Sequence, residues 1–133
     1  GESKLVNEMP IISSVYHNRI NRRMKLEADP TILYYMSQND LSEFKKSVGT
    51  SKSYKIFNKY KKNNNPYNTY LNYGIPVGPI NNPGLLAIEA TLKPDKTNYI
   101  YFVKESKDAG SHVFSTNIRD HEKAKQKYLR SRK

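Results

Sequence analysis

The most constraining feature of the chain is the segment NNNPYNTYLNYGIPVGPINNPG, which occupies residues 63–84. It contains four prolines, three glycines and three tyrosines, and it has no charged residue. Proline lacks a backbone N–H and glycine loosens the backbone, so neither a regular helix nor a regular strand fits here. We therefore expect a loop, but one whose many aromatic rings need a structural or functional explanation.

Two helices are expected near the N-terminal end. Residues 10–24 carry one apolar stripe at helical spacing, and Pro10 fits the first turn, where its missing N–H costs nothing. The second helix is expected over residues 28–36. Asp29 has the side chain of an N-cap and Pro30 suits the first helical position.

Further helices are expected on both sides of the loop. Residues 37–49 predict a short helix that ends at Gly49, while residues 53–62 fit either a helix or a strand. After the loop, Asn82 is expected to cap a helix that Pro83 begins. The apolar residues expected on the buried face of that helix are Leu85, Leu86, Ile88, Ala90 and Leu92.

The C-terminal third combines strands with a last helix. Residues 97–105 and 111–115 are rich in β-branched and aromatic residues and predict a hairpin with residues 106–110 as its loop. The chain then closes with a basic helix that begins at Thr116 or Asn117. The pattern predicts an α+β fold in one domain of 133 residues, and not an alternating α/β sheet.

Composition narrows the classes of function. The net charge of +11 indicates an anionic partner but does not choose one, and the absence of cysteine excludes disulfides and thiol catalysis. The three histidines have no metal-ligand spacing, so we expect no metal or cofactor. Tyrosine and phenylalanine alternate with lysine in residues 53–62, as in nucleic-acid binders, but a helix with an inward aromatic face explains them better.

Several blocks together resemble the endolytic murein transglycosylases of the MltG (YceG-like) family. The longest and most specific is PYNTYLNYGIPVGPINNPG. It is joined by IISSVYHNRI, by MKLEADPTILYYM, and by YIYFV and SHVFS before the last helix. The similarity covers roughly residues 1–36 and 66–130. It implies a lysozyme-like, transglycosylase-type catalytic domain built from helices and a small hairpin sheet.

The resemblance also assigns a catalytic residue. Counting back from Asn18 and Arg19 aligns Glu2 with the family's catalytic glutamate, the second acid of a Glu-Lys-Glu type motif. The first acid is absent here, so we expect a catalytic-domain fragment without the family's LysM-like region and membrane anchor. There are departures from the family pattern. Residues 37–65 look like an insertion or a divergent segment, and Val77 stands where a proline is usual.

The implied reaction is non-hydrolytic cleavage of the MurNAc–GlcNAc β-1,4 bond of peptidoglycan, which leaves a 1,6-anhydro end. In this mechanism Glu2 first donates a proton to the leaving oxygen and then accepts one from the sugar's own C6 hydroxyl. The implied partners are glycan strands and the cell-wall synthesis machinery. The implied location is the extracytoplasmic face of the bacterial inner membrane, with the full-length protein anchored there.

Loop residues suit the binding of sugars, because their hydroxyl and amide groups match those of a glycan. The residues expected to bind substrate are Tyr67, Asn68, Thr69, Tyr70, Asn82, Glu27 and His112. Two of these rest on other arguments. Glu27 replaces an amide of the family pattern and either adds a charge near the cleft or faces water, and His112 is the histidine best placed to line a site.

Alternatives remain open at this stage. The loop tyrosines and asparagines also fit a loop that braces itself through Asx turns, and some residues can brace while others bind. The whole chain also fits a non-catalytic glycan-binding module. A nucleic-acid binder is the third alternative, although it depends on charge alone.

Overall fold

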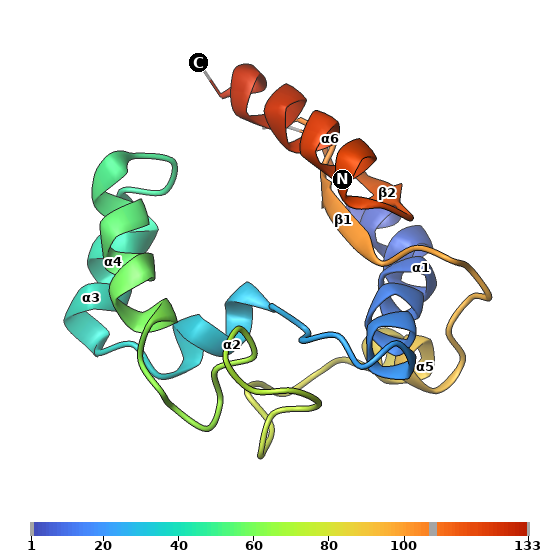
Figure 1. Ribbon diagram of the computed structural model, residues 1–133, viewed down its shortest axis with the longest axis horizontal. Coiled ribbons are helices and arrows are strands. Elements are labelled where there is room, and N and C mark those ends of the chain that lie inside the picture. The colour runs from blue at the N-terminus through green and yellow to red at the C-terminus, as the bar shows by residue number, and fades with distance from the viewer. Residues whose placement is uncertain (1, 107–108, 133) are drawn as a thin grey trace. The chain divides into compact units, whose positions relative to one another are not determined.

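The computed structural model describes residues 2–106 and 109–132, and it describes side chains from residue 6 onward. Within these residues it contains six helices and one antiparallel hairpin, which confirms the predicted α+β class (Figure 1). The contacts divide the chain into two compact units. Unit 1 comprises residues 1–22 and 83–133, and unit 2 comprises residues 23–82.

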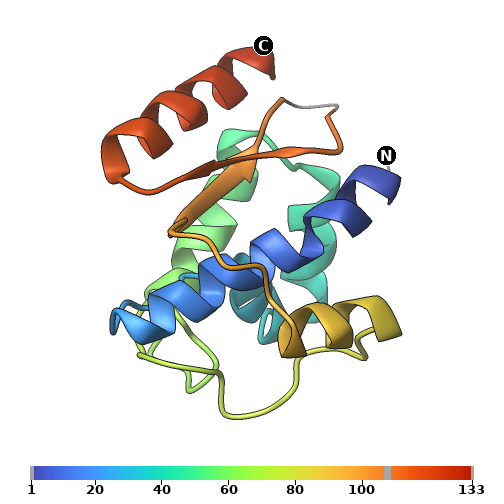
Figure 2. The ribbon, with the colours of Figure 1, turned by 90° about the vertical axis from the view of Figure 1, so that its right-hand side faces the viewer.

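Unit 1 is built on the long helix α1 (Glu2–Asn21). Helix α5 (Leu85–Leu92) packs against α1, and so does strand β1 (Tyr101–Lys104). Strand β2 (His112–Ser115) pairs with β1 so that Phe102 faces Phe114. Helix α6 (Ile118–Ser131) covers both strands, as the red helix beside the orange hairpin shows (Figure 2).

The core of unit 1 is small and includes Val15, Ala90 and Ile100, each less than 8% exposed. Helix α5 buries only Ala90 of the five apolar residues predicted to form its inner face. Leu85 and Leu92 are more than 70% exposed. The prediction was wrong because these five residues do not share one face at 100° per residue, so one neighbouring helix cannot cover them all.

Unit 2 is a set of three helices followed by the loop. They are α2 (Asp29–Tyr34), α3 (Gln38–Lys46) and α4 (Ser51–Lys61), and α4 packs against the other two. Residues 53–62, for which helix and strand were both open, are therefore helical to Lys61. Leu26, Ile32 and Met36 form the buried apolar core of this unit.

Three predicted helix starts need correction. Pro10 lies inside α1 and not in its first turn, because α1 extends back to Glu2. Ala28, not Asp29, is the N-cap of α2, and the cap of α5 is Gly84 instead of Asn82. In the last helix, by contrast, Asn117 accepts a hydrogen bond from the backbone N–H of Asp120, as an N-cap should.

Candidate functional site

Helix α1 is fixed near its N-terminal end by a carboxylate and a histidine. The backbone N–H of His112 donates to both oxygens of Glu8, at 3.0 and 3.1 Å, and its ring Nδ1 lies 2.9 Å from Oε1. Both side chains are 15% exposed. The ring of His112 also meets Phe102 and Phe114 edge-on or tilted. One acidic side chain thus ties α1 to the start of β2.

The Asn-Arg pair at the other end of α1 holds the extended segment that leads into β1. Asn18 Nδ2 donates to the carbonyls of Thr97 and Tyr99, at 2.8 and 2.9 Å. Arg19 is buried, its Nε donates to the Ile100 carbonyl at 2.7 Å, and its guanidinium lies 5.0 Å from the ring of Tyr101. These bonds give three backbone carbonyls of the segment a partner from α1.

Two further contacts complete the support of α1. The hydroxyls of Ser14 and Thr97 lie 2.6 Å apart, and His17 Nε2 donates to the carbonyl of Thr91 in α5 at 2.9 Å. Helix α1 is therefore held by α5, by the segment before β1 and by β2. Such contacts, spread along a helix, keep its residues in fixed register with their surroundings.

The predicted catalytic residue, Glu2, is the first residue of α1. The contacts of its side chain lie outside the part of the chain whose side chains the structure describes. Glu2 and His112 both belong to unit 1, whereas the other predicted binding residues, Tyr67 to Tyr70, Glu27 and Asn82, belong to unit 2.

Within unit 2, two of the predicted binding residues are braces. Asn68 is 0% exposed; its amide donates to the carbonyls of Lys61 and Asn63, and its oxygen accepts from the backbone N–H of Tyr70. Thr69 is 2% exposed, and its hydroxyl accepts from the backbone N–H of Ala28 at 2.9 Å. These contacts agree with the alternative of a loop that braces itself.

Tyr70 is also turned toward its own unit. Its hydroxyl donates to Asp29 Oδ1, and its ring lies edge-on to Phe57 at 6.1 Å and under the ammonium group of Lys61 at 4.7 Å. Asp29 therefore does have a specific partner, although that partner is a tyrosine from the loop and not a helix N–H. The contact joins the start of α2 to the loop.

Tyr67 contacts a second tyrosine, Tyr34, whose ring is exposed at the surface. Its ring lies 4.6 Å from the ring of Tyr34, at an angle of 39°. Burial raises the pKa of the Tyr67 hydroxyl, and the hydrogen bond to Tyr34 raises it further. A Cβ at Gly78 would lie 2.8 Å from the Tyr67 hydroxyl, so only glycine fits there without a shift.

The remaining two predicted residues are exposed. Glu27 has a positive φ of 48°, and its backbone N–H donates to the carbonyl of Thr69 at 3.2 Å. That bond brings residues 27 and 69 together, so Glu27 lies beside the loop. Asn82 is exposed, at the end of unit 2.

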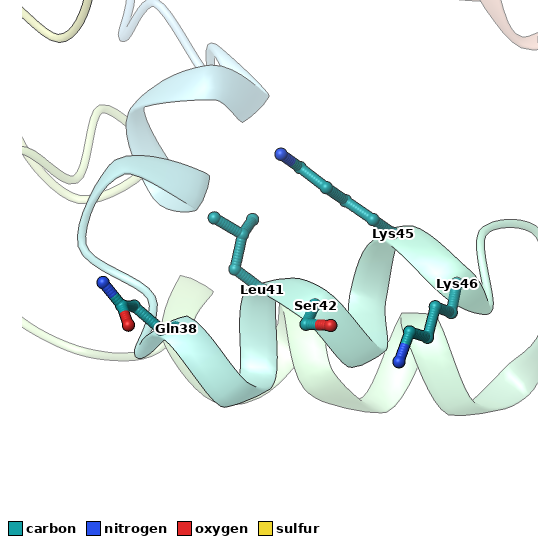
Figure 3. A pocket seen from close by; sticks show the side chains of 5 residues that line it. All are labelled: Gln38, Leu41, Ser42, Lys45 and Lys46. Carbon is teal, nitrogen blue, oxygen red and sulfur yellow. The ribbon is translucent and has the colours of Figure 1, made fainter.

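One surface hollow of unit 2 lies on helix α3 and lacks the groups expected of a sugar site. It has a volume of about 470 Å³ and is lined by Gln38, Leu41, Ser42, Lys45 and Lys46 of α3 (Figure 3). Leu41 and Lys45, one turn apart, extend to the same side of the helix. The lining offers neither a carboxylate nor an aromatic ring, which glycan cleavage and sugar stacking require.

Two kinds of feature are absent from the described part of the chain. Among residues 2–106 and 109–132, no group of three or more histidine, aspartate or glutamate side chains is placed to hold a metal ion. In the same ranges, no helix combines the length and apolar character needed to cross a membrane.

Sequence reasoning missed the contacts that support α1. It gave Glu8 no partner, and it used Asn18 and Arg19 only to align the family motif, although these three residues join α1 to the hairpin region. Their partners lie about 80 to 100 positions away in sequence. To identify these contacts from the sequence, one would have to know which distant positions the fold brings together.

Comparison with known proteins gives the family. The chain belongs to the YceG-like family, whose model matches residues 1–127. It is 40% identical over 121 residues to the endolytic murein transglycosylase of Bacillus subtilis (strain 168), an alignment that covers 91% of this chain and 29% of the relative. The endolytic murein transglycosylase of Streptococcus pneumoniae serotype 2 (strain D39) is 28% identical over 98% of this chain and 22% of its own length.

A solved structure shows the same fold. The yceG-like protein lmo1499 from Listeria monocytogenes has a TM-score of 0.62 and 35% sequence identity, over 84% of this chain and 31% of that protein. The chain thus spans less than a third of each of these proteins. The family match runs through residues 37–65, which contain all of α3 and α4.

Proposed function

We propose that the chain is the catalytic part of an endolytic lytic transglycosylase that cleaves the β-1,4 bond between MurNAc and GlcNAc in peptidoglycan. The observation that carries this proposal is the 40% identity to a murein transglycosylase over nearly the whole chain. The contacts that hold α1 also favour the proposal, because catalysis requires the residue that transfers the proton to be held in a fixed position.

The proposed chemistry uses one carboxyl group twice. Glu2 in its acid form donates its proton to the glycosidic oxygen as the bond to C1 of the MurNAc ring breaks. The resulting carboxylate accepts the proton of the C6 hydroxyl of the same ring, and O6 bonds to C1. The products are a 1,6-anhydro-MurNAc end and a free GlcNAc 4-hydroxyl, and Glu2 regains its proton.

This cycle explains why one acid is enough. Hydrolytic glycosidases use a second carboxylate as a nucleophile or as a base for water. Here the nucleophile is tethered to the substrate, and its proximity replaces that second group. The proposal places the reaction at the extracytoplasmic face of the membrane, where peptidoglycan and its synthesis machinery lie.

Product analysis tests the proposal. The protein, extended to include the residues upstream of Glu2, is incubated with purified sacculi, and the released fragments are identified by mass spectrometry. We expect 1,6-anhydro ends from the wild type and a loss of at least about 100-fold in Glu2→Gln, as is typical when an acid–base group is removed. Glu89→Gln, an exposed glutamate on α5, is the matched control and should remain active.

Two outcomes contradict the proposal. Anhydro ends that persist in Glu2→Gln would show that another group transfers the proton. Retention of wild type and variant on sacculi without any products would instead favour a non-catalytic glycan-binding module.

A further inference from the structure

Tyr34 and Tyr67 form an aromatic pair at the surface of unit 2. Tyr34 is the last residue of α2 and is 48% exposed. The two ring centroids are 4.6 Å apart. Sequence reasoning named Tyr67 but not Tyr34.

The backbone of the loop holds Tyr67 in place. The backbone N–H of Tyr67 is bound by Asn65 Oδ1 at 2.9 Å, and the next two residues, Asn68 and Thr69, are buried. Gly78 leaves space for the Tyr67 hydroxyl. A ring fixed in this way loses little conformational entropy when a ligand stacks on it, which favours binding.

The loop segment that contains Tyr67 is itself uncharged and rich in hydrogen-bonding groups. Residues 63–84 contain no charged side chain, although the whole chain carries a net charge of +11. A charged ligand would find no ion pair within this segment. A sugar ring suits it, because its C–H face is attracted to the negative face of an aromatic ring and its hydroxyls bind phenols and amides.

We propose that Tyr34 and Tyr67 form a carbohydrate subsite that stacks one N-acetylhexosamine ring of a β-1,4-linked glycan. The identity of the glycan rests on the proposed function, whereas the stacking itself rests on the aromatic pair. The subsite holds a ring of the glycan strand and takes no part in the proton transfers.

Binding of a neutral oligosaccharide tests the subsite directly. The probe is the β-1,4-linked tetramer of N-acetylglucosamine, titrated by calorimetry into the 133-residue chain. We expect Tyr34→Leu, which keeps apolar bulk but removes the ring, to weaken binding about five- to tenfold. Tyr34→Trp, which keeps an aromatic face, should bind within about twofold of the wild type.

The chain provides a matched control. Tyr54 lies on α4 of the same unit and is 68% exposed, so Tyr54→Leu removes an exposed ring that is not a member of the pair. It should leave binding unchanged. The proposal is overturned if Tyr34→Leu binds like the wild type, if Tyr54→Leu weakens binding equally, or if the wild type does not bind the tetramer.

The sacculus assay separates this proposal from the proposed function. Where both hold, Tyr34→Leu raises KM for sacculi and leaves kcat nearly unchanged, because the lost contact is made equally in the ground state and the transition state. Where the wild type makes no anhydro ends but still needs Tyr34 for tetramer binding, the proposed function fails and the subsite stands. A fall in kcat with unchanged KM contradicts the subsite.

Discussion

The guanidinium of Arg19 is buried between the Ile100 carbonyl and the ring of Tyr101. Lysine has no Nε–H at this position and no planar cation to lie on the ring. We therefore expect Arg19→Lys to lower the free energy of unfolding by about 1.5–3 kcal/mol, the usual value of a hydrogen bond from a charged group. Urea unfolding followed by circular dichroism measures this loss.

The control for Arg19 lies three residues further along the chain. Arg22 is exposed just beyond the end of α1, so Arg22→Lys should change the free energy of unfolding by less than about 0.5 kcal/mol. Equal losses in the two variants would show that burial and the bond to Ile100 do not matter.

Gly78 is the residue that allows Tyr67 to keep its position. A Cβ here would lie 2.8 Å from the Tyr67 hydroxyl, so Gly78→Ala should displace the ring and lower stability by about 1–3 kcal/mol, as overpacking does. The displacement is measured as a chemical-shift change of the Tyr67 ring protons. Gly84→Ala, where a Cβ meets nothing within 4 Å, should leave those protons unchanged.

At the residue scale, the sequence predicts the type of a contact better than its partner. Asn68 and Thr69 were predicted to bind sugar, with a self-bracing loop as the alternative, and the structure bonds both of them within unit 2. The role of Glu8 was not predicted, because its partner His112 lies 104 positions away in the sequence and only the fold brings the two together. Composition and local spacing contain no record of such a pairing.

At the scale of elements, Glu8 connects α1 to the hairpin. Glu8→Ala leaves the backbone N–H and ring Nδ1 of His112 without their acceptor. An unsatisfied buried donor costs about 1–3 kcal/mol, so we expect faster hydrogen exchange of the β1–β2 amides by a factor of about 10 or more. Mass spectrometry of peptides from residues 101–115 measures this exchange.

A second glutamate in the hairpin region is the control for Glu8. Glu105 accepts a bond from the exposed hydroxyl of Ser111 at 2.6 Å. Water can replace that bond, so Glu105→Ala should change the exchange of the strand amides only slightly. If the two variants behaved alike, Glu8 would not be the link between α1 and β2.

The contact between α3 and α4 should depend on pH. The hydroxyl of Tyr60 donates to Asp40 and, with help from the nearby Lys59, lowers the pKa of that carboxyl below its ordinary value of 3.8. A carboxylate with a lowered folded pKa stabilises the fold above its unfolded pKa, and this stabilisation disappears as the pH falls through the folded pKa. The α3–α4 contact should therefore weaken below pH 3.8.

Hydrogen exchange of the α4 amides at about pH 5 and about pH 3, corrected for intrinsic rates, measures this dependence. In Asp40→Asn the part of the change that is due to Asp40 should be absent. A full acid response in that variant would assign the effect to Glu43, whose pKa is also lowered, chiefly by its hydrogen bond from Lys52.

Sequence patterns predicted which elements exist better than where they begin. Both strands, the last helix and its Asn117 cap follow from β-rich residues and a capping side chain, which are local signals. The helix start predicted at Pro10 was wrong. A proline inside a helix costs about 3 kcal/mol, and only the tertiary contacts of α1 can offset that cost. The cap predicted at Asn82 was wrong, because a helix does not always begin next to a residue that is suited to cap it.

At the scale of the whole molecule, charge and recognition are separate properties. The net charge of +11 is spread over lysines and arginines, whereas the Tyr34–Tyr67 pair lies beside a segment without charge. The net positive charge would attract an anionic polymer, such as peptidoglycan with its stem peptides, over a long range. Stacking on a neutral sugar ring would depend on the aromatic pair and not on charge.

Salt should separate these two contributions. Raising the ionic strength from about 0.1 M to about 1 M shortens the screening length from about 10 Å to about 3 Å, so retention of the protein on sacculi should fall several-fold. The dissociation constant for the neutral tetramer should change by less than about twofold, because no charge is paired in that contact. Pelleting measures the first and calorimetry the second. Tetramer binding that weakens in parallel with sacculus retention would mean that lysines, and not the tyrosine pair, hold the sugar.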